Sequence, residues 1–389
     1  MVDLASFRIG ESPIPPCLPA SFVIIGTVLL AAVSTGEDVP RLVAKRRAMQ
    51  TLVASAETPH RPYLAFPAVL DLGTELLVSF KQGRTHAGDL GASLAWLRLD
   101  KRTHQKRAAG TLAELPAEIM QMGEWVRFPN GQIANYIDVQ STASRRSGLG
   151  LVRSSDGGQT FGPLQRLGPV EGVEYGYAFD SISQHDSTWL LVMTFANLPG
   201  GKRVYSYPSQ PGSVDVIRSD DSGQSWRFVR SITQELDGAP INESTFLADG
   251  DHFLIAARGY DGRHWLTRTD AQWKVVAKTD LKASHAFVQS IDRPRLFQRD
   301  GRFYLLGRNR LGSRHSELAL FQFQPETLKI ERHVVLDTAK DQSPGDSYYA
   351  QPYWNEPDGQ TLFHVVTYKR VHGPGLDIVR LEFDWQEVR

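Results

Sequence analysis

The chain alternates short apolar runs with polar turns, a pattern typical of β-strands rather than helices. The clearest runs lie at residues 75–80, 189–195, 252–257, 302–306 and 361–366, and turns containing Asp-Gly or Asn-Gly recur along the chain. Tight turns of this kind join short strands into hairpins. The pattern therefore predicts an all-β protein.

The runs belong to a repeated unit of a first strand, a turn, an apolar second strand, a polar loop and a third strand. Six such units begin near Tyr63, Gly123, Tyr175, Pro240, Ile291 and Ser347. Each spans roughly 40 to 60 residues, the size of a four-stranded propeller blade. We therefore expect a six-bladed β-propeller of four-stranded antiparallel blades over residues 60–389, although periodicity alone does not separate six blades from seven.

Two eight-residue segments, 154–161 and 219–226, share the pattern Ser-x-Asp-x-Gly-x-Ser/Thr-aromatic. The Asp side chain can accept backbone N–H groups of its own turn, the Gly supplies a left-handed conformation, and the aromatic residue can pack beneath the hairpin. The pattern resembles the Asp-box, or BNR repeat, of sialidases and related β-propellers. In that family the motif lies at the blade periphery, so it indicates the scaffold and not the chemistry.

Composition excludes several classes of function. The chain has 43 basic and 43 acidic residues, so no basic field indicates a nucleic-acid partner. Cys17 is the only cysteine, which excludes an intramolecular disulfide framework and a cysteine-rich metal site.

The N-terminus contains an apolar run of twelve residues, 22–33, followed by small residues. It is too short to span a bilayer but suits the core of a signal peptide. We expect residues 1–36 to be a signal peptide or N-terminal extension of a secreted or periplasmic protein without an integral membrane span. A buried strand or a misassigned start is the alternative. Residues 37–59 are expected to form a linker with a short helix.

A propeller places the first strand of every blade around its central channel, so polar residues at the unit starts should converge. These residues are Glu124, Tyr177, Asp180, Glu243, Arg293, Arg295, Tyr348 and Tyr349. They form either a site for an anionic or polyhydroxylated ligand or a solvated mouth whose charges neutralise one another.

Three segments extend the resemblance to the catalytic residues of the sialidase superfamily, over residues 60 to 385. Asn242-Glu243-Ser244 is similar to the segment with the catalytic glutamate, Ser347-Tyr348-Tyr349 to the tyrosine segment, and residues 83–89 to the loop with the acid/base aspartate. The resemblance implies that Tyr349 attacks the anomeric carbon, Glu243 takes its proton, and Asp89 protonates the leaving oxygen.

The same resemblance implies arginines that bind an acidic group of the substrate. Arg258 and Arg314 match two members of the family's triad, and Arg84 and Glu124 are further candidates for contacts with substrate. When the anomeric carbon itself bears a carboxylate, its negative charge repels a carboxylate nucleophile, which explains why the family uses a tyrosine as nucleophile. The chemistry requires no metal or other cofactor, and we expect a monomer acting on a glycan or glycoconjugate.

One departure concerns the first arginine of the triad. The family typically begins its first blade with Phe-Arg-Ile-Pro, whereas residues 64–67 read Leu-Ala-Phe-Pro and place Ala65 at the arginine position. Near the end, where the family often has a supporting glutamate, residues 366–368 read Val-Thr-Tyr. Arg61 and Arg84 are nearby arginines that could compensate. The expected substrate shifts from ordinary sialic acid toward another acidic or modified sugar.

Three functions fit these residues. The first is a sialidase-like retaining exo-glycosidase, the second a non-catalytic glycan-binding propeller, and the third a propeller polysaccharide lyase that uses Tyr349 or His86 on a uronate. His86 lies three residues before Asp89, but without a further ligand a structural role is favoured over a metal pair.

Overall fold

The computed structural model describes residues 39–142, 145–198, 202–204 and 212–389. Contacts divide the chain into two compact units, Met1–Glu37 and Asp38–Arg389, and the described residues lie in the second. Cys17 and the apolar run at 22–33 lie outside the described residues.

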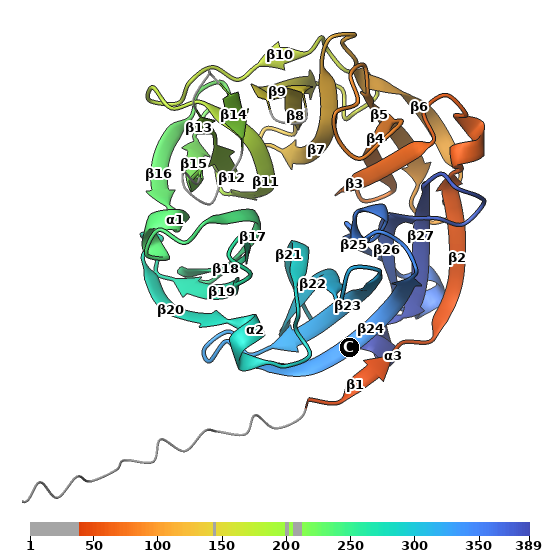
Figure 1. The fold of residues 1–389 in the computed structure, drawn as a ribbon, viewed down its shortest axis with the longest axis vertical. Coiled ribbons are helices and arrows are strands. Elements are labelled where there is room, and N and C mark those ends of the chain that lie inside the picture. Colours follow the sequence, from red (N-terminus) through yellow and green to blue (C-terminus); the bar gives the residue numbers. More distant parts are fainter. Residues whose placement is uncertain (1–38, 143–144, 199–201, 205–211) are drawn as a thin grey trace, which may run out of the picture. The chain divides into compact units, whose positions relative to one another are not determined.

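Six antiparallel sheets surround a central channel and confirm the expected six-bladed propeller (Figure 1). The first two blades contain β3 (Tyr63–Asp71), β4 (Glu75–Gly83), β5 (Ser93–Asp100) and β6 (Lys106–Ala113), then β7 (Ile119–Arg127), β8 (Ile133–Thr142), β9 (Arg145–Ser154) and β10 (Gln165–Arg166). The third blade contains β11 (Tyr175–Gln184), β12 (Ser187–Thr194), β15 (Val214–Ser219) and β16 (Arg227–Ser231), with the separate hairpin β13 (Ala196–Leu198) and β14 (Lys202–Val204).

The remaining blades follow the same order. The fourth contains β17 (Ile241–Asp249), β18 (His252–Gly259), β19 (His264–Thr269) and β20 (Val275–Asp280), and the fifth contains β21 (Ile291–Arg299), β22 (Arg302–Arg310), β23 (His315–Phe323) and β24 (Ile330–Lys340). The sixth contains β25 (Gln351–Asn355), β26 (Leu362–Lys369), β27 (Asp377–Asp384) and β2 (Arg46–Val53). Short helices are η1 (Ser55–Glu57), α1 (Ile232–Glu235), α2 (Leu281–Ser284), η3 (Pro344–Asp346), η4 (Pro357–Gly359) and α3 (Trp385–Val388). Among the described residues, no helix is long and apolar enough to cross a membrane.

The linker expected at residues 37–59 instead contributes two strands. β2 is the outermost strand of the sixth blade and pairs with β27, and β1 (Arg41–Val43) adds a parallel strand to the fifth blade beside β24. No residue of β2 is buried and half of them are exposed, so the strand lacks the apolar alternation that marks the other strands. Since β2 and β27 come from opposite ends of this unit, their pairing closes the ring.

The two Ser-x-Asp segments form the same turn. The Asp156 carboxylate accepts the N–H of Thr160 at 3.0 Å, and that of Asp221 accepts the N–H of Ser225 at 2.9 Å. Gly223 has a left-handed φ of 78°. Each aromatic residue that ends the segment packs beside another ring: Phe161 lies 5.1 Å from Trp96 and Trp226 lies 6.0 Å from Tyr136. The carboxylates thus replace ladder hydrogen bonds where two strands reverse direction.

His333 lies between two aromatic rings in the fifth blade. Its ring stacks on Phe321 at 4.8 Å and on Phe287 at 5.0 Å, and neither nitrogen has a hydrogen-bond partner among the described residues. The Glu317 carboxylate is 3.8 Å away but already pairs with Arg41. Burial, aided by Arg41, lowers the pKa of His333 to about 4.

The first prediction concerns acid stability. The pKa of His333 is about 6.5 in the unfolded chain and about 4 in the folded chain. At pH values between these two, the unfolded chain binds a proton at His333 that the folded chain does not, so the stability of the fold decreases as the pH decreases. Replacing His333→Phe should reduce the difference in unfolding free energy between pH 7 and pH 5 by about 2 kcal/mol. Urea unfolding at both pH values measures it, with the exposed His60→Phe as control. Equal differences in wild type and both variants would contradict the prediction.

Candidate active site

Bulges in the innermost strands aim side chains into the channel. In β17 the pairing with β18 skips from Ile241 to Ser244, which leaves Asn242 and Glu243 without cross-strand partners. In β21 the pairing skips from Asp292 to Arg295. A bulge releases a residue from the alternation of the strand and turns its side chain toward a new direction. This local irregularity brings residues from different blades together.

Tyr349 and Glu243 form a direct hydrogen-bonded pair. The Tyr349 hydroxyl donates to Oε1 of Glu243 in a short contact, while Oε2 accepts the backbone N–H of Arg293 at 2.9 Å and Nη1 of Arg258 at 3.1 Å. Burial, and next the Glu243 carboxylate, raises the pKa of Tyr349 well above its ordinary value, although Arg308 and Arg258 oppose this shift. Tyr349 is therefore a neutral phenol beside a proton acceptor.

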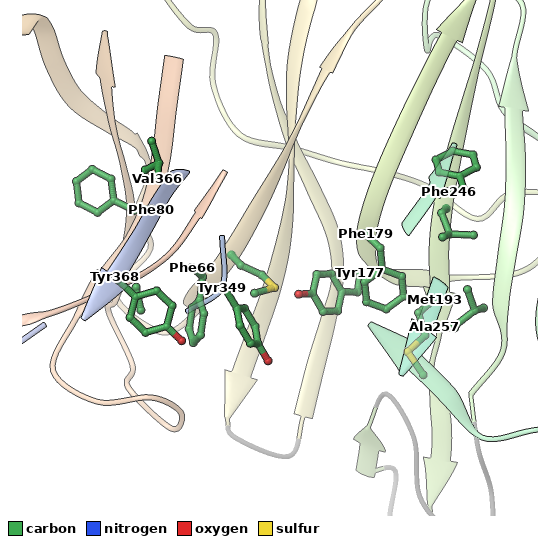
Figure 2. Close-up of a cluster of buried hydrophobic side chains, with 14 of the residues drawn as sticks. Phe66, Phe80, Tyr177, Phe179, Met193, Phe246, Ala257, Tyr349, Val366 and Tyr368 are labelled. Carbon is green, nitrogen blue, oxygen red and sulfur yellow. The ribbon is translucent and has the colours of Figure 1, made fainter. Parts of the chain in front are cut away.

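The pair lines a cavity of about 280 Å³, which we name the Tyr349 cavity. Figure 2 shows Tyr349 beside Phe66, whose ring lies 5.3 Å away, and Tyr177 opposite them. Phe66 has a left-handed φ of 58°, a strained conformation for a bulky residue. The lining also includes His86, Gln121, Asp138, Gln140, Asn242 and Arg258. Phenol, carboxylate, amide and guanidinium groups around an aromatic wall suit a sugar ring.

A buried carboxylate holds three arginines behind this cavity. Asp292 is 0% exposed and contacts Nε of Arg258 at 3.0 Å, Nη2 of Arg308 at 2.9 Å and Nε of Arg310 at 3.1 Å. Burial alone would raise the pKa of Asp292, but Arg308, Arg258 and Arg310 outweigh it and hold the pKa below its ordinary value. Arg308 also lies over the Tyr349 ring, with 4.7 Å between its guanidinium carbon and the ring centre. The cluster therefore braces both Tyr349 and Glu243.

Glu124 lies in a neighbouring ionic network rather than in the lining of the cavity. Its Oε2 pairs with Arg293 at 2.8 Å and with Arg295 at 2.5 Å, and Arg295 also reaches Asp180 at 3.3 Å. The polar residues at the starts of the units therefore lie close together, as expected, but these charged groups mainly form ion pairs with one another.

Asp89 and Arg84 lie apart from the Tyr349 cavity. The Asp89 carboxylate accepts the backbone N–H groups of Arg84 and Thr85 and pairs with Nε of Arg84 at 3.0 Å. Both residues line a separate cavity of about 290 Å³ with Arg61 and His60. The spacing of the loop matched the family, but the carboxylate turns back to stabilise the loop's own backbone.

Arg314 is exposed, and its Nη2 donates to the carbonyl of Asp341 at 3.0 Å, whereas Arg308 and Arg310 of β22 contact the buried Asp292. The family resemblance pointed to Arg314, which follows β22, whereas Arg308 and Arg310 lie at the end of that strand. The apolar run of β22 ends at Leu306, but the strand stays buried through Asn309, so the sequence gives no signal that Arg308 is buried.

Neither Arg61 nor Arg84, the two arginines that could compensate for Ala65, lines the Tyr349 cavity. Ala65 is fully buried, and Tyr368 fills the region near the chain end, packing against Phe66 at 5.5 Å. Arg61 is bound to Glu114 at 2.6 Å and to Ser93 at 3.1 Å. The aromatic rings of Phe66 and Tyr368 therefore pack together where the resemblance implied an arginine and its supporting glutamate.

His86, for which the sequence favoured a structural role over a metal pair or a lyase base, lines the Tyr349 cavity. Its Nδ1 lies 2.8 Å from the Tyr63 hydroxyl, and the buried Lys81 ammonium donates to the carbonyls of Thr85 and His86 at 3.0 and 3.1 Å. Burial and the neighbouring Lys81 lower the pKa of His86 below its ordinary value. Lys81 therefore fixes a neutral imidazole at the cavity wall. Among the described residues, no group of three or more His, Cys, Asp or Glu side chains could hold a metal.

Comparisons with known proteins identify similar folds. A scan of protein-family models found no match, and a search of curated proteins found none either. A solved protein of unknown function from Dyadobacter fermentans is 16% identical, with a TM-score of 0.66 over 89% of this chain and 99% of that one. A mutant of the NanB sialidase from Streptococcus pneumoniae is 11% identical, with a TM-score of 0.59 over 90% of this chain and 71% of that one. A Trypanosoma rangeli sialidase is 10% identical, with a TM-score of 0.55 over 84% and 55%. At such low identities, the TM-scores show a shared fold alone.

The second prediction tests the buried carboxylate. Replacing Asp292→Asn removes the negative charge that three arginines share and should lower the unfolding free energy by about 3 kcal/mol, because an unbalanced buried charge is costly. Urea unfolding measures the loss. The control is Asp358→Asn, since the Asp358 side chain is 89% exposed and should leave stability unchanged. Equal stability of the two variants would show that the arginines do not need Asp292.

Proposed function

We propose that this protein is a retaining exo-glycosidase that removes a terminal sugar, expected to be acidic or modified, from a glycan. The observation that carries the proposal is the hydrogen bond from the Tyr349 hydroxyl to Glu243 inside a cavity of sugar size. A phenol with a raised pKa is a weak nucleophile by itself, so an adjacent base is what makes attack possible. The structural similarity to sialidase propellers supports the same class of chemistry.

In the proposed reaction, the Tyr349 oxygen attacks the anomeric carbon as its proton passes to Glu243 and the bond to the leaving oxygen breaks. Water then attacks the anomeric carbon and the bond to the Tyr349 oxygen breaks; Glu243 returns its proton to that oxygen, and the carboxylate of the residue that protonated the leaving group takes a proton from the water. Arg258 lines the cavity and can donate to an acidic group of the sugar. It already contacts Glu243 and Asp292, so it offers the substrate only its remaining N–H groups.

The leaving oxygen needs a proton donor, and two aspartates are candidates. Asp89 is the prediction from sequence, whereas Asp138 of β8 lines the Tyr349 cavity. Turnover of the Asp138→Asn and Asp89→Asn variants distinguishes them when aryl glycosides with good and poor leaving groups are compared. The variant that removes the general acid should lose turnover chiefly on aryl glycosides with poor leaving groups, because good leaving groups depart without being protonated.

The third prediction concerns the nucleophile. Tyr349→Phe should reduce kcat/KM by at least about a hundredfold without preventing substrate binding, since it removes only the attacking oxygen. Hydrolysis of fluorogenic α-sialosides, uronic-acid glycosides and neutral glycosides measures it.

The matched control is Tyr348→Phe. The Tyr348 hydroxyl donates to Asp337 at 3.1 Å, and Tyr348 does not line the Tyr349 cavity. If both variants lose the same activity, or if Tyr349→Phe keeps full activity, Tyr349 is not the nucleophile. If no glycoside is cleaved but one binds, the protein is a glycan-binding propeller.

His86 favours one second candidate, a polysaccharide lyase acting on a uronate. His86, Tyr349 and Arg258 line the same cavity, which places a base, a phenol and a carboxylate-binding group together. In that reaction a base takes the C5 proton, the bond to the C4 oxygen breaks with proton donation to that oxygen, and a C4–C5 double bond forms.

The fourth prediction separates the two reactions by their products. A lyase would give an unsaturated uronate that absorbs in the ultraviolet, and His86→Ala would abolish that absorbance. The glycosidase that we propose should give a reducing sugar with no such absorbance. Ultraviolet spectroscopy of digests of polyuronates and glycosides tests both at once.

We also propose that the protein is secreted or periplasmic and acts as a monomer. The apolar run at residues 22–33 supports export, where glycan substrates are accessible. Cell fractionation and mass spectrometry of the mature N-terminus test export, and light scattering tests the oligomeric state.

A further inference from the structure

A second cavity lies next to the Tyr349 cavity and shares Arg258 and Tyr260 with it. Its volume is about 450 Å³, and it is formed by the turn between β18 and β19, the start of α2 and the end of β22. We name it the Lys282 cavity; its walls include Arg258, Tyr260, His264, Lys282, Ser290 and Arg310. A ligand in the Tyr349 cavity can therefore extend into this neighbouring space.

The walls of the Lys282 cavity are basic. Arg258, Lys282 and Arg310 line it, and no Asp or Glu stands among the described residues of its lining. Asp292 is fully buried and contacts Arg258 and Arg310, and Glu243 also contacts Arg258, so two carboxylates offset part of the charge of the two arginines. The space itself keeps a positive potential, which favours an anion.

Lys282 adds an exposed positive charge to this cavity. Its side chain is exposed and makes no ion pair with a described residue. Asp280, two residues before Lys282, accepts the backbone N–H groups of Lys282 and His264, each at 3.1 Å, and Asp261, in the turn between β18 and β19, pairs with Arg263 at 2.6 Å. An incoming oxyanion would thus meet a free ammonium group.

Tyr260 connects the two cavities. It is 44% exposed, and its ring centre lies 6.0 Å from the guanidinium carbon of Arg258. An exposed aromatic ring between two polar cavities suits the apolar face of a sugar, while ammonium and guanidinium groups beyond it suit an oxyanion.

We propose that the Lys282 cavity is a subsite for an anionic substituent, a sulfate or a carboxylate, on the sugar next to the one held in the Tyr349 cavity. This inference rests on the proposed function in that it assigns the terminal sugar to the Tyr349 cavity. It makes a charged glycan the preferred substrate class, with Lys282 as the determinant of specificity and Tyr260 as the surface beneath the second sugar.

Calorimetric titration of the full chain carrying Tyr349→Phe measures binding without turnover. The probes are N-acetyllactosamine, its 6-O-sulfated form and a matched disaccharide with a uronate carboxylate at the same position. The charged forms should bind about tenfold more tightly than the neutral one, and the preference should weaken with added salt. Lys282→Gln should reduce the preference by about threefold to fivefold. The control Lys274→Gln, at an exposed lysine outside the cavity, should not change it.

Each result decides the proposal. Tighter binding of the sulfated or of the carboxylated probe, lost in Lys282→Gln, supports the subsite and shows which anion it takes. Equal binding of neutral and charged probes, or equal losses in the Lys282 and Lys274 variants, overturns it. If the wild-type chain hydrolyses a glycoside yet shows no preference for charge, the subsite fails and the proposed function stands. If the preference is present and no glycoside is cleaved, the subsite stands in a binding protein and the proposed enzyme fails.

Discussion

The pairing of buried arginines with buried carboxylates is the constraint on which the centre of this propeller depends. Five arginines face the channel from the fifth blade and its neighbour, and their partners are Glu124, Asp180, Glu243 and Asp292. A buried guanidinium without a partner would destabilise the fold by several kcal/mol. Since these residues lie on strands of different blades, the ionic network fixes the blades relative to one another and sets the position of each side chain at the site.

Tyr349 and Glu243 gain their geometry from that network. Glu243 is held by Arg258 and by the backbone of Arg293, while Arg308 lies over the Tyr349 ring. The hydroxyl and carboxylate are thus oriented before any ligand arrives, which reduces the reorganisation that a reaction would require. The same network limits what the arginines can do: their contacts with Asp292 leave fewer N–H groups for a substrate carboxylate than an open triad would offer.

Sequence patterns predicted most of the architecture but only part of the site. First strands begin at Tyr63, Tyr175 and Ile291 as expected, because apolar alternation and turn residues are local properties. The contact between Tyr349 and Glu243 agrees with the resemblance that selected them, although their catalytic roles stay predictions. Asp292 was not considered, because its importance comes from three arginines that lie close only in the folded chain. The strand β2 was missed for a similar reason, since its partner β27 follows more than 300 residues later.

The most direct test of the account is to trap the glycosyl-enzyme. A fluorinated glycosyl fluoride of the best substrate slows hydrolysis of the intermediate, so the modified residue can be identified by mass spectrometry of peptides. The account predicts one added sugar on the Tyr349 oxygen, absent in Tyr349→Phe and retained in Tyr348→Phe. A sugar attached to another side chain, or turnover with inversion at the anomeric carbon, would contradict it.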